Sequence, residues 1–390
     1  MLTLDNVRST WVEINLDNLA HNIREVKKST NEDTLITAVV KANAYGHGAI
    51  ASSKVFLENG GDRLAVATLS EAIEIRRAGI DVPILILAFT PISQYREIIE
   101  YDIIQTIYNY SEAIILSKYA VEMAKSVKIH IKIDTGMGRV GYLPSEEAIE
   151  EIIKISKLPN IEIEGIFTHF ATADEVDKSF TNLQYNRFVD VINKLEDRGL
   201  NIPIKHAANS AAIIDLPEYN LNMVRAGIML YGLYPSPYVD KSRIKLKPAM
   251  TLKTRISNIK TVPKGYGISY GQIFATEKES KIATIPIGYA DGFTRLLTSR
   301  GEAFTNGKIV PIVGRICMDQ SMLDITEIEN ASVGDEVILF GSGEKGLHID
   351  EVANKLNTIN YEIVCMVGRR VPRVYLKNGE IVGIMDYILE

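Results

Sequence analysis

A lysine placed directly after an apolar run is the first residue of this sequence that could do chemistry. The run Leu35–Val40 is rich in β-favouring residues and ends at Lys41, and small residues with two glycines, Gly46 and Gly48, follow before a helical pattern. This succession predicts a buried strand, a tight loop and a helix start. Burial lowers the pKa of an amine and so makes it a nucleophile and a base at neutral pH. A lysine at such a position could also simply extend its ammonium to solvent.

The elements that would position this lysine form a repeating pattern. Short apolar strands alternate with longer helical patterns, and eight such units in this length predict a (β/α)8 barrel of the TIM type. An open doubly wound sheet is the alternative, but it usually has fewer strands and a glycine-rich first turn. The predicted strands, of which the last two are weak and are required by the spacing, are Leu35–Val40, Leu64–Thr68, Pro83–Leu87, Ile103–Tyr108, Val127–Asp134, Ile161–His169, Ile204–Ala208 and Asn222–Arg225. The predicted helices include Ser70–Ala78, Ser111–Lys125, Ser145–Ser156 and Thr181–Arg198.

The carboxyl ends of barrel strands are where active sites lie. Five of the eight predicted strand ends carry lysine, arginine, histidine or serine and few carboxylates: Lys41, Lys132–Tyr142, Thr168–Phe170, His206–Ser210 and Val224–Ile228. Cationic and hydroxyl-bearing residues at this end of the barrel are suited to bind a phosphate and a carboxylate. Gly227 allows backbone N–H groups to approach a phosphate closely. Pyridoxal 5′-phosphate is a cofactor that combines a phosphate with a need for a Schiff-base lysine.

A second domain is predicted where the helical pattern stops. We expect residues 1–240 to form the cofactor-binding barrel and residues 241–390 to form a mostly β domain, after a linker with Pro235, Pro237 and Pro248. Asn306-Gly307 is a hairpin-turn signal. The early strand Thr10–Asn15 could join either domain. The expected strands of the β domain are Leu252–Val262, Lys281–Ile287, Ile309–Val313, Glu336–Phe340 and Ile381–Tyr387, with one short helix at Ile349–Leu356.

The composition excludes several classes of protein. The 390 residues carry a net charge of −6, so no basic surplus exists for nucleic acid or anionic lipid. No signal-peptide pattern opens the chain and no apolar run approaches the ~20 residues of a membrane helix, so we expect a cytoplasmic protein. The two cysteines, Cys317 and Cys365, could pair, but buried free thiols are expected, and no zinc-type spacing of Cys and His predicts a metal site.

At this point the sequence resembles a known family, the alanine racemases. The stretch Val39–Gly48 resembles their cofactor-lysine signature, and further matching motifs follow in the family's order over nearly the whole chain. They are Lys132–Tyr142, Thr168–Phe170, His206–Ser210, Val224–Gly232, Gly267–Gly271, Gly288–Gly292, Arg315–Asp319 and Asn360–Glu362. The resemblance implies a barrel followed by a β domain, and homodimers whose active sites combine both subunits. It also implies a role in supplying D-alanine for peptidoglycan.

The resemblance also implies catalytic roles. Lys41 resembles the lysine that holds pyridoxal 5′-phosphate as an aldimine and then acts as one of two bases. Tyr270 resembles the second base, which comes from the partner subunit, because a proton must leave one face of Cα and return to the other. His169 and Arg225 resemble the relay that lowers the cost of ionising this tyrosine.

Arg225 occupies the family's position opposite the pyridine nitrogen of the cofactor, where most such enzymes place a carboxylate. An arginine can only donate hydrogen bonds, so it keeps that nitrogen unprotonated and disfavours side reactions such as transamination.

Binding residues follow from the same resemblance. For the cofactor they are Tyr45, His169, Asn209, Ser210, Gly227, Ile228 and Tyr361, beside Lys41 and Arg225. For the substrate they are Arg139, Met318, Lys132, Asp319, Tyr289 and Arg295. Among these, Arg139 and the backbone near Met318 match the carboxylate-binding pair, and Lys132 matches a lysine that is carbamylated in many members and orients Arg139. Tyr361 and Met318 match residues that narrow the pocket to a methyl side chain, and Tyr289 and Arg295 match residues of the entry path.

Three other functions share parts of this pattern. A related racemase could prefer serine or a larger side chain. A decarboxylase of basic amino acids shares the architecture, but its cysteine and acidic substrate motifs are missing here. A non-enzymatic cofactor-binding protein resembles the barrel alone, and the β domain with Tyr270 argues against it.

Overall fold

The structure is a computed structural model that describes residues 3–4, 7–343 and 347–389. Its contacts divide the chain into two compact units, and each is described by itself. The first unit comprises Ala20–Ala44 and Ala49–Leu246, and the second comprises Met1–Leu19, Tyr45–Gly48 and Lys247–Glu390. The short segment Tyr45–Gly48, directly after the candidate lysine, therefore belongs to the second unit.

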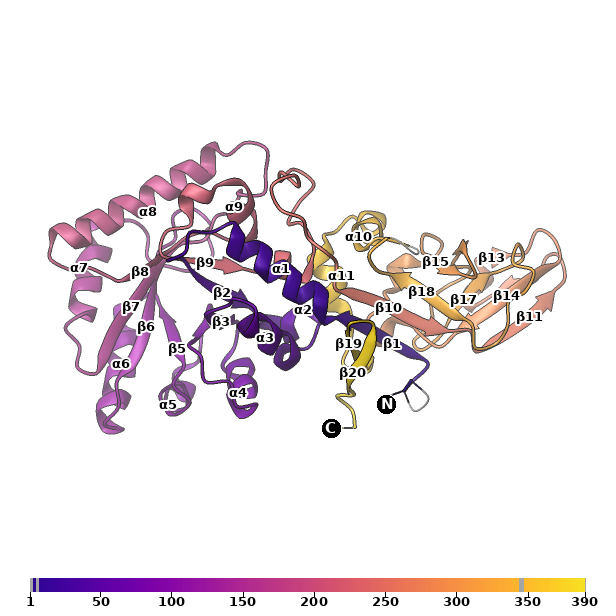
Figure 1. Ribbon diagram of the computed structural model, residues 1–390, viewed down its shortest axis with the longest axis horizontal. Helices are drawn as coiled ribbons and strands as arrows, with labels where there is room; N and C mark the ends of the chain where they lie inside the picture. Colours follow the sequence, from indigo (N-terminus) through magenta and orange to yellow (C-terminus); the bar gives the residue numbers. More distant parts are fainter. Residues whose placement is uncertain (1–2, 5–6, 344–346, 390) are drawn as a thin grey trace. The chain divides into compact units, whose positions relative to one another are not determined.

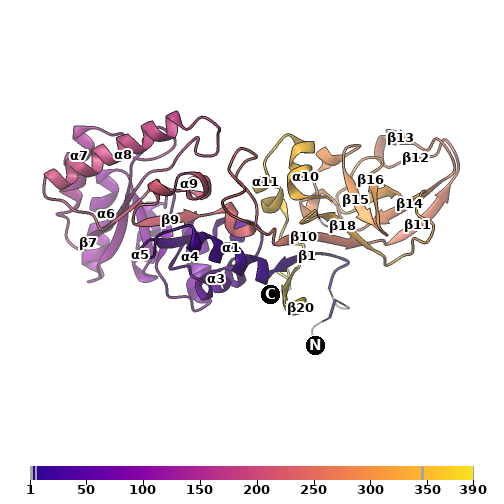
Figure 2. The ribbon, with the colours of Figure 1, turned by 45° about the horizontal axis from the view of Figure 1, so that its top comes forward.

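The first unit contains eight parallel strands in the order β8-β7-β6-β5-β4-β3-β2-β9. Figures 1 and 2 draw this unit in indigo to rose and label several of its strands, among them β7 and β9. Backbone bonds from Asn222 N to Lys205 O (3.1 Å) and from Arg225 N to Ala208 O (3.0 Å) link β8 to β9 and close the barrel. The predicted barrel fold is thus confirmed. The strands are β2 (Leu35–Val39), β3 (Arg63–Val66), β4 (Ile84–Ile86), β5 (Ile104–Ile107), β6 (Val127–Lys132), β7 (Ile161–Phe167), β8 (Ile204–His206) and β9 (Met223–Ala226).

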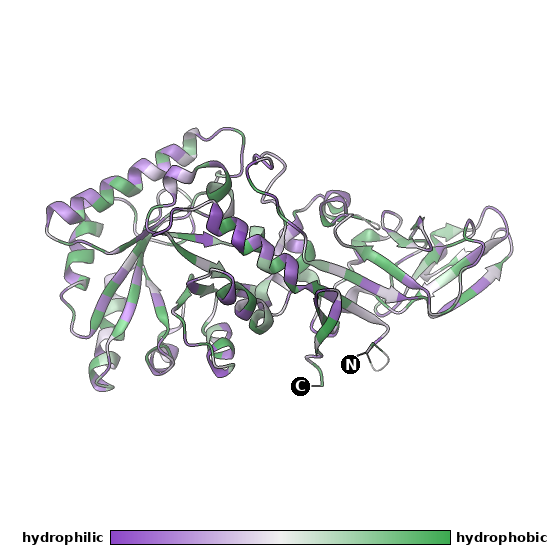
Figure 3. Ribbon diagram, in the orientation of Figure 1, coloured by the Kyte–Doolittle hydropathy of each residue, from purple (hydrophilic) through white to green (hydrophobic). Residues whose placement is uncertain are grey.

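Helices follow most of the strands. Several of them begin at capping residues and bury one apolar face. Thr68 and Glu71 form a capping box at the start of α4, and Asn109, Ser145 and Asn209 cap α6, α7 and α9. Hydrophobic and hydrophilic residues alternate along α8 in Figure 3, and its buried residues recur every three or four positions. The helices are α1 (Leu16–Lys28), α2 (Lys41–Tyr45), α3 (Ala49–Glu58), α4 (Leu69–Arg77), α5 (Tyr95–Glu100), α6 (Tyr110–Glu122), α7 (Glu146–Ile155), α8 (Ser179–Asp197) and α9 (Ser210–Asp215), with 3-10 turns η1 (Ile92–Gln94), η2 (Pro217–Tyr219) and η3 (Ile228–Tyr231).

The second unit is rich in antiparallel sheet. Its main sheet has the order β16-β15-β18-β10-β1-β19-β20, beside a three-stranded sheet β11-β14-β17 and the pair β12-β13. The strands are β1 (Thr10–Asn15), β10 (Met250–Arg255), β11 (Asn258–Val262), β12 (Gly267–Ile268), β13 (Phe274–Ala275), β14 (Ser280–Ile285), β15 (Glu302–Thr305), β16 (Lys308–Pro311), β17 (Ser321–Asp324), β18 (Glu336–Phe340), β19 (Arg373–Lys377) and β20 (Glu380–Met385). Its helices are η4 (Tyr270–Gln272), η5 (Tyr289–Asp291), η6 (Arg295–Leu297), α10 (Ile349–Leu356) and α11 (Asn360–Met366).

Three local predictions in this unit can be compared with the structure. The early strand β1 pairs with β10 in antiparallel and with β19 in parallel orientation, so it belongs to the main sheet here. The hairpin turn is confirmed, because β15 and β16 pair up to Thr305 opposite Lys308, and Asn306 and Gly307 have positive φ angles of 48° and 81°. The single strand predicted over Leu252–Val262 is wrong. The first strand, β10, ends at Arg255, and a second strand, β11, begins at Asn258. The two strands pair in different sheets.

Candidate active site

Lys41 stands directly after the buried end of β2, at the start of a left-handed turn. Ala42, Asn43 and Ala44 each have a φ of 53°, a conformation that costs most residues roughly 1 kcal/mol or more. Local bonds hold the turn: Glu71 Oε1 accepts from Ala42 N (2.6 Å) and Asn43 Oδ1 accepts from Ala49 N (2.8 Å). Backbone strain that the surroundings enforce is typical of functional sites. The turn holds Lys41 half-buried at the strand end.

Arg225 lies buried at the end of β9, where the strand-end pattern placed a cation. Its Nη1 donates to His206 Nδ1 (2.7 Å), and its Nη2 donates to Thr168 O (2.8 Å) and Ala207 O (3.0 Å). Within the described residues, its Nε donates to no protein acceptor. Burial, and then the nearby Arg139, lowers the pKa of Arg225 to about 9, so the guanidinium remains cationic at neutral pH.

His169 follows β7 and lies beside Arg225, with its Nδ1 3.3 Å from Arg225 Nη2. Burial lowers the pKa of His169 well below its ordinary value, and the charges of Arg225, Arg139, Lys132 and Lys41 lower it further. The imidazole is therefore neutral at physiological pH, and its Nδ1 can share, as a third and more distant acceptor, one of the two N–H groups that Nη2 donates to Thr168 O and Ala207 O.

Lys132 ends β6 and is almost fully buried. Its Nζ donates to Ile133 O (2.8 Å) and lies 5.4 Å from the centre of the Phe167 ring. Burial, followed by repulsion from Arg225, lowers the pKa of Lys132 to about 7. A substantial fraction of this lysine is therefore a neutral amine near neutral pH.

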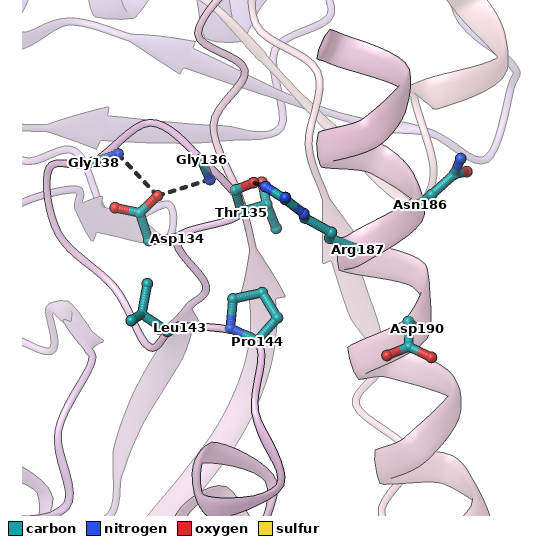
Figure 4. Close-up of a pocket in the computed structure, with 9 residues that line it drawn as sticks. All are labelled: Asp134, Thr135, Gly136, Gly138, Leu143, Pro144, Asn186, Arg187 and Asp190. Atoms are coloured by element: carbon teal, nitrogen blue, oxygen red, sulfur yellow. Dashed lines mark hydrogen bonds between the residues drawn. The ribbon is translucent and has the colours of Figure 1, made fainter. Parts of the chain in front are cut away.

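The loop that carries Arg139 is built around one carboxylate. Asp134 Oδ1 accepts from Gly136 N and Gly138 N (both 3.0 Å), and Oδ2 accepts from Arg139 N (2.9 Å). Burial opposes ionisation of Asp134, but these three N–H groups hold its pKa below the ordinary value. Figure 4 shows the carboxylate inside its loop, and Arg187 of α8 donating to Thr135 O (2.9 Å) from the other side of a pocket. The loop is thus fixed while the Arg139 residue itself is exposed.

Two other strand ends come together at the proposed phosphate position. Asn209 Oδ1 caps α9 by accepting from Ala212 N (3.1 Å), and Ser210 Oγ accepts from Gly227 N (3.0 Å). Ile228 then begins η3. The Ser210 hydroxyl and the Ile228 N–H are donors of the kind that a phosphate requires, and the Gly227 N–H would become one if it turned from Ser210 to the phosphate.

In the second unit, Tyr270 lies on the surface with Met318 and Asp319. Tyr270 is 70% exposed and Met318 is 52% exposed, and all three residues line one pocket. Tyr289 N donates to Cys317 O (3.1 Å), which ties η5 to the segment that carries Met318. Gly271, with φ of +70°, allows this arrangement, because a Cβ there would lie 2.6 Å from Arg315 Nη1.

The remaining site residues, Tyr45, Tyr361, Asp319 and Arg295, lie at three different places in the second unit. Tyr45 and Tyr361 come together with ring centres 6.2 Å apart, and burial raises the pKa of Tyr45 well above its ordinary value. Asp319 pairs with Arg370 (2.8 Å). Arg295 lies exposed in η6 and is not among the residues that line the Tyr270 pocket.

Comparison with known proteins decides the family. The alanine racemase N-terminal domain matches residues 14–235, and the alanine racemase C-terminal domain matches residues 249–375. This chain belongs to the alanine racemase family. An alanine racemase of Clostridium tetani is 54% identical over 386 residues, which cover 98% of this chain and 99% of that protein.

Solved structures of alanine racemases share the whole architecture. That of Clostridium difficile 630 has a TM-score of 0.95 at 47% identity and covers 100% of both chains. That of Bacillus anthracis, solved with bound L-Ala-P, has a TM-score of 0.92 at 40% identity and covers 98% of both chains. Alanine racemases depend on pyridoxal 5′-phosphate. No helix among the described residues is long and apolar enough to cross a membrane.

The donor set of the barrel fits the family's cofactor. Lys41 offers an amine, the Ser210–Gly227 corner offers donors for a phosphate, and Arg225 keeps one N–H available for an acceptor outside the chain. The described residues contain no group of three or more His, Cys, Asp and Glu residues that could hold a metal ion.

Two residues behind this site were not singled out from the sequence. His130 and Glu164 lie inside the barrel and are connected to Arg225 through His206. His130 shares a face of β6 with Lys132 by regular alternation and could have been found from it, whereas Glu164 is the extra residue at a register shift on β7, which alternation does not reveal.

Proposed function

We propose that this protein interconverts L-alanine and D-alanine with pyridoxal 5′-phosphate bound covalently to Lys41. In a bacterium this activity supplies D-alanine for peptidoglycan. The observation that carries the proposal is the position of Lys41 after β2 in a barrel whose other strand ends gather Arg225, His169 and the Ser210–Gly227 corner. Membership of the alanine racemase family supports it over the full chain.

When bound, the cofactor withdraws electrons from Cα and so makes the α-proton of alanine removable. Arg225 would donate a hydrogen bond to the ring nitrogen of the cofactor and would keep that nitrogen unprotonated, because a guanidinium that stays cationic has no proton to give up. Ser210, the N–H groups of Gly227 and Ile228, Tyr45 and Tyr361 would bind the phosphate, and Asn209 caps α9, which begins at Ser210.

Two bases act on opposite faces of Cα. Lys41 Nζ takes or returns the proton on one face, and Oη of Tyr270 of the partner subunit does so on the other. The exposure of Tyr270 within its own chain supports this assignment, because a base that serves another subunit must be accessible. His169 and Arg225, in contact with each other and with His169 neutral, form the relay that stabilises the ionised tyrosine.

The substrate carboxylate binds Arg139 and the backbone near Met318. Asp134 fixes the loop that carries Arg139, so little conformational entropy is lost when the carboxylate binds. Met318 and Tyr361 limit the pocket to a methyl group, Tyr289 and Arg295 line the entry path, and Asp319 belongs to the substrate-binding residues.

Lys132 is expected to be carbamylated. A neutral amine attacks CO2, and the resulting anion is a suitable partner for Arg139. With ¹³C-bicarbonate, a carbamate signal should appear in the ¹³C spectrum, and it should weaken as the pH falls through about 7, where the amine becomes protonated. Lys132→Arg, which stays protonated, is the control and should show no signal. A signal that persists in this variant would place the carbamate elsewhere.

The proposed function is tested by incubating the holoenzyme with L-alanine in heavy water. D-alanine should form, and each molecule of product should carry deuterium at Cα, because the proton returns from a base that exchanges with solvent. L-serine and L-lysine are the comparison substrates. Release of CO2 from L-lysine would identify a decarboxylase, and faster racemisation of serine than of alanine would identify the related racemase. A protein that binds the cofactor and turns over none of these substrates is not an enzyme of this class.

A further inference from the structure

A chain of polar side chains runs through the interior of the barrel behind Arg225. TIM-type barrels are normally filled by branched apolar side chains, so buried polar groups need an explanation. Here Arg225 Nη1 lies 2.7 Å from His206 Nδ1, His206 Nε2 lies 2.8 Å from His130 Nδ1, and His130 Nε2 lies 3.0 Å from Glu164 Oε2. Both histidines are fully buried.

The order of these contacts determines which nitrogen of each histidine carries the proton. Arg225 can only donate, so His206 Nδ1 must accept. A neutral His206 then carries its proton on Nε2 and donates it to His130 Nδ1. By the same reasoning, His130 carries its proton on Nε2 and donates it to Glu164. Burial lowers the pKa of both histidines, which agrees with two neutral rings.

The fold places Glu164 and His130 together through a β-bulge. The pairing of β6 with β7 passes from Ile129 opposite Ile163 to His130 opposite Gly165, so Glu164 is the extra residue on β7. Gly165 is required beside it, because a Cβ there would lie 2.5 Å from the His130 ring. Phe167 stacks on His206 with ring centres 4.7 Å apart. The rings are thereby held in the positions that the hydrogen bonds require.

Two cations keep Glu164 ionised at the far end of the chain. Arg63, which is buried, bonds to Oε2, and Lys128 bonds to Oε1 (2.9 Å) with its side chain 45% exposed. Burial alone would raise the pKa of Glu164, but the bonds from His130, Arg63 and Lys128 hold it well below the ordinary value. A buried ion pair is weak evidence for stability, since apolar residues of similar volume often serve as well. The cluster therefore calls for another role.

We propose that Glu164 and His130 are positioning residues for Arg225. The carboxylate and the guanidinium act from the two ends of the chain and together fix the tautomer of both histidines, so that His206 presents a lone pair to Arg225 and holds the guanidinium in place. If His206 carried its proton on Nδ1 instead, two donors would face each other and Arg225 would be displaced. The inference deepens the proposed function and rests on the role of Arg225 stated there. Its first test uses no substrate, so it can fail or succeed independently of the racemase activity.

The first test is ¹⁵N NMR of the holoenzyme labelled at its six histidines. Signals are assigned with His130→Asn and His206→Asn. Both rings should show a protonated Nε2 and an unprotonated Nδ1. A protonated Nδ1 on either ring, or a doubly protonated ring, overturns the proposal.

The second test removes the carboxylate without leaving a buried charge. The double variant Arg63→Met, Glu164→Leu replaces the pair by apolar residues of similar volume, and Lys128 can turn to solvent. The tautomer of His206 should become mixed, and kcat should fall by about 10- to 100-fold, the range of one hydrogen bond to a charged group. The melting temperature should stay close to that of the wild type. An unchanged His206 signal or an unchanged kcat overturns the proposal.

The matched control is Glu162→Leu, the same substitution at the exposed start of β7. It should change neither the histidine signals nor kcat. If the double variant fails to fold, Glu164→Gln keeps one acceptor oxygen for Arg63 and His130, removes the charge, and places an NH2 donor toward Lys128, which can turn to solvent. The His130 Nε2 signal should then shift and kcat should fall by about tenfold, as for a weakened bond to a charged group. If the His130 Nε2 signal and kcat of Glu164→Gln both equal those of the wild type, Glu164 is not a positioning residue.

Discussion

Tyr270→Phe is expected to abolish racemisation while leaving one half of the chemistry intact. Lys41 still removes and returns a proton on its own face of Cα, so one enantiomer of alanine should exchange its α-proton with heavy water and keep its configuration. Racemisation should fall by about 10²- to 10⁴-fold, the range for a positioned acid–base group. The measurement follows deuterium by NMR and chirality by chromatography for L-alanine and D-alanine separately.

The matched control for this variant is Tyr266→Phe, four residues earlier and also exposed. It should racemise alanine at the wild-type rate. If Tyr270→Phe exchanges the protons of both enantiomers as fast as the wild type, the tyrosine is not a base. If Tyr270→Phe exchanges the α-proton of neither enantiomer, Lys41 cannot act as a base without the tyrosine.

Arg225→Glu is expected to change the outcome of the reaction. A carboxylate at this position lets the cofactor ring nitrogen become protonated and delocalises the negative charge of the deprotonated substrate into the ring. A long-wavelength absorbance band should appear with alanine, racemisation should slow by at least about 10²-fold, and pyruvate should form by transamination. These readouts come from absorbance spectra and from a pyruvate assay.

The control for Arg225→Glu is Arg225→Lys, which keeps a cation but loses the donors that contact His206, Thr168 and Ala207. It should racemise slowly without forming pyruvate. Cofactor occupancy is measured first in both variants, because Arg225 lies near the phosphate corner. If the absorbance spectrum of Arg225→Glu with alanine matched that of the wild type, Arg225 would not be the partner of the ring nitrogen.

Much of the barrel site could be predicted from the rule that strand ends carry the chemistry. Arg225 and His169 are 56 residues apart in the chain yet lie in contact, and Ser210 meets Gly227 across two strand ends. The polar residues themselves mark where the strands end, so the predicted strands ran slightly long: β6 ends at Lys132 and not at Asp134.

Other features depend on contacts that no local pattern contains. The partners of β1 are β10 and β19, which lie more than 200 residues away, so its propensity could not choose a sheet. The break between β10 and β11 arises because the two halves pair with different strands. Gly165 inside β7 is compatible with a bulge, but no local pattern shows that the bulge leaves Glu164 as the extra residue and aims its carboxylate at His130. The shift of the Lys132 pKa comes from burial near Arg225, which is distant in sequence.

The central claim is that each active site combines Lys41 of one subunit with Tyr270 of the partner subunit, and complementation tests it most directly. Lys41→Ala should be inactive alone, and borohydride should fix the cofactor to Lys41 in the wild type but not in this variant. When Lys41→Ala and Tyr270→Phe are co-expressed, a mixed dimer has one site with both defects and one with neither. Random pairing should restore roughly a quarter of wild-type activity. Mixed dimers that are present and show no activity above the two parents would contradict the shared site.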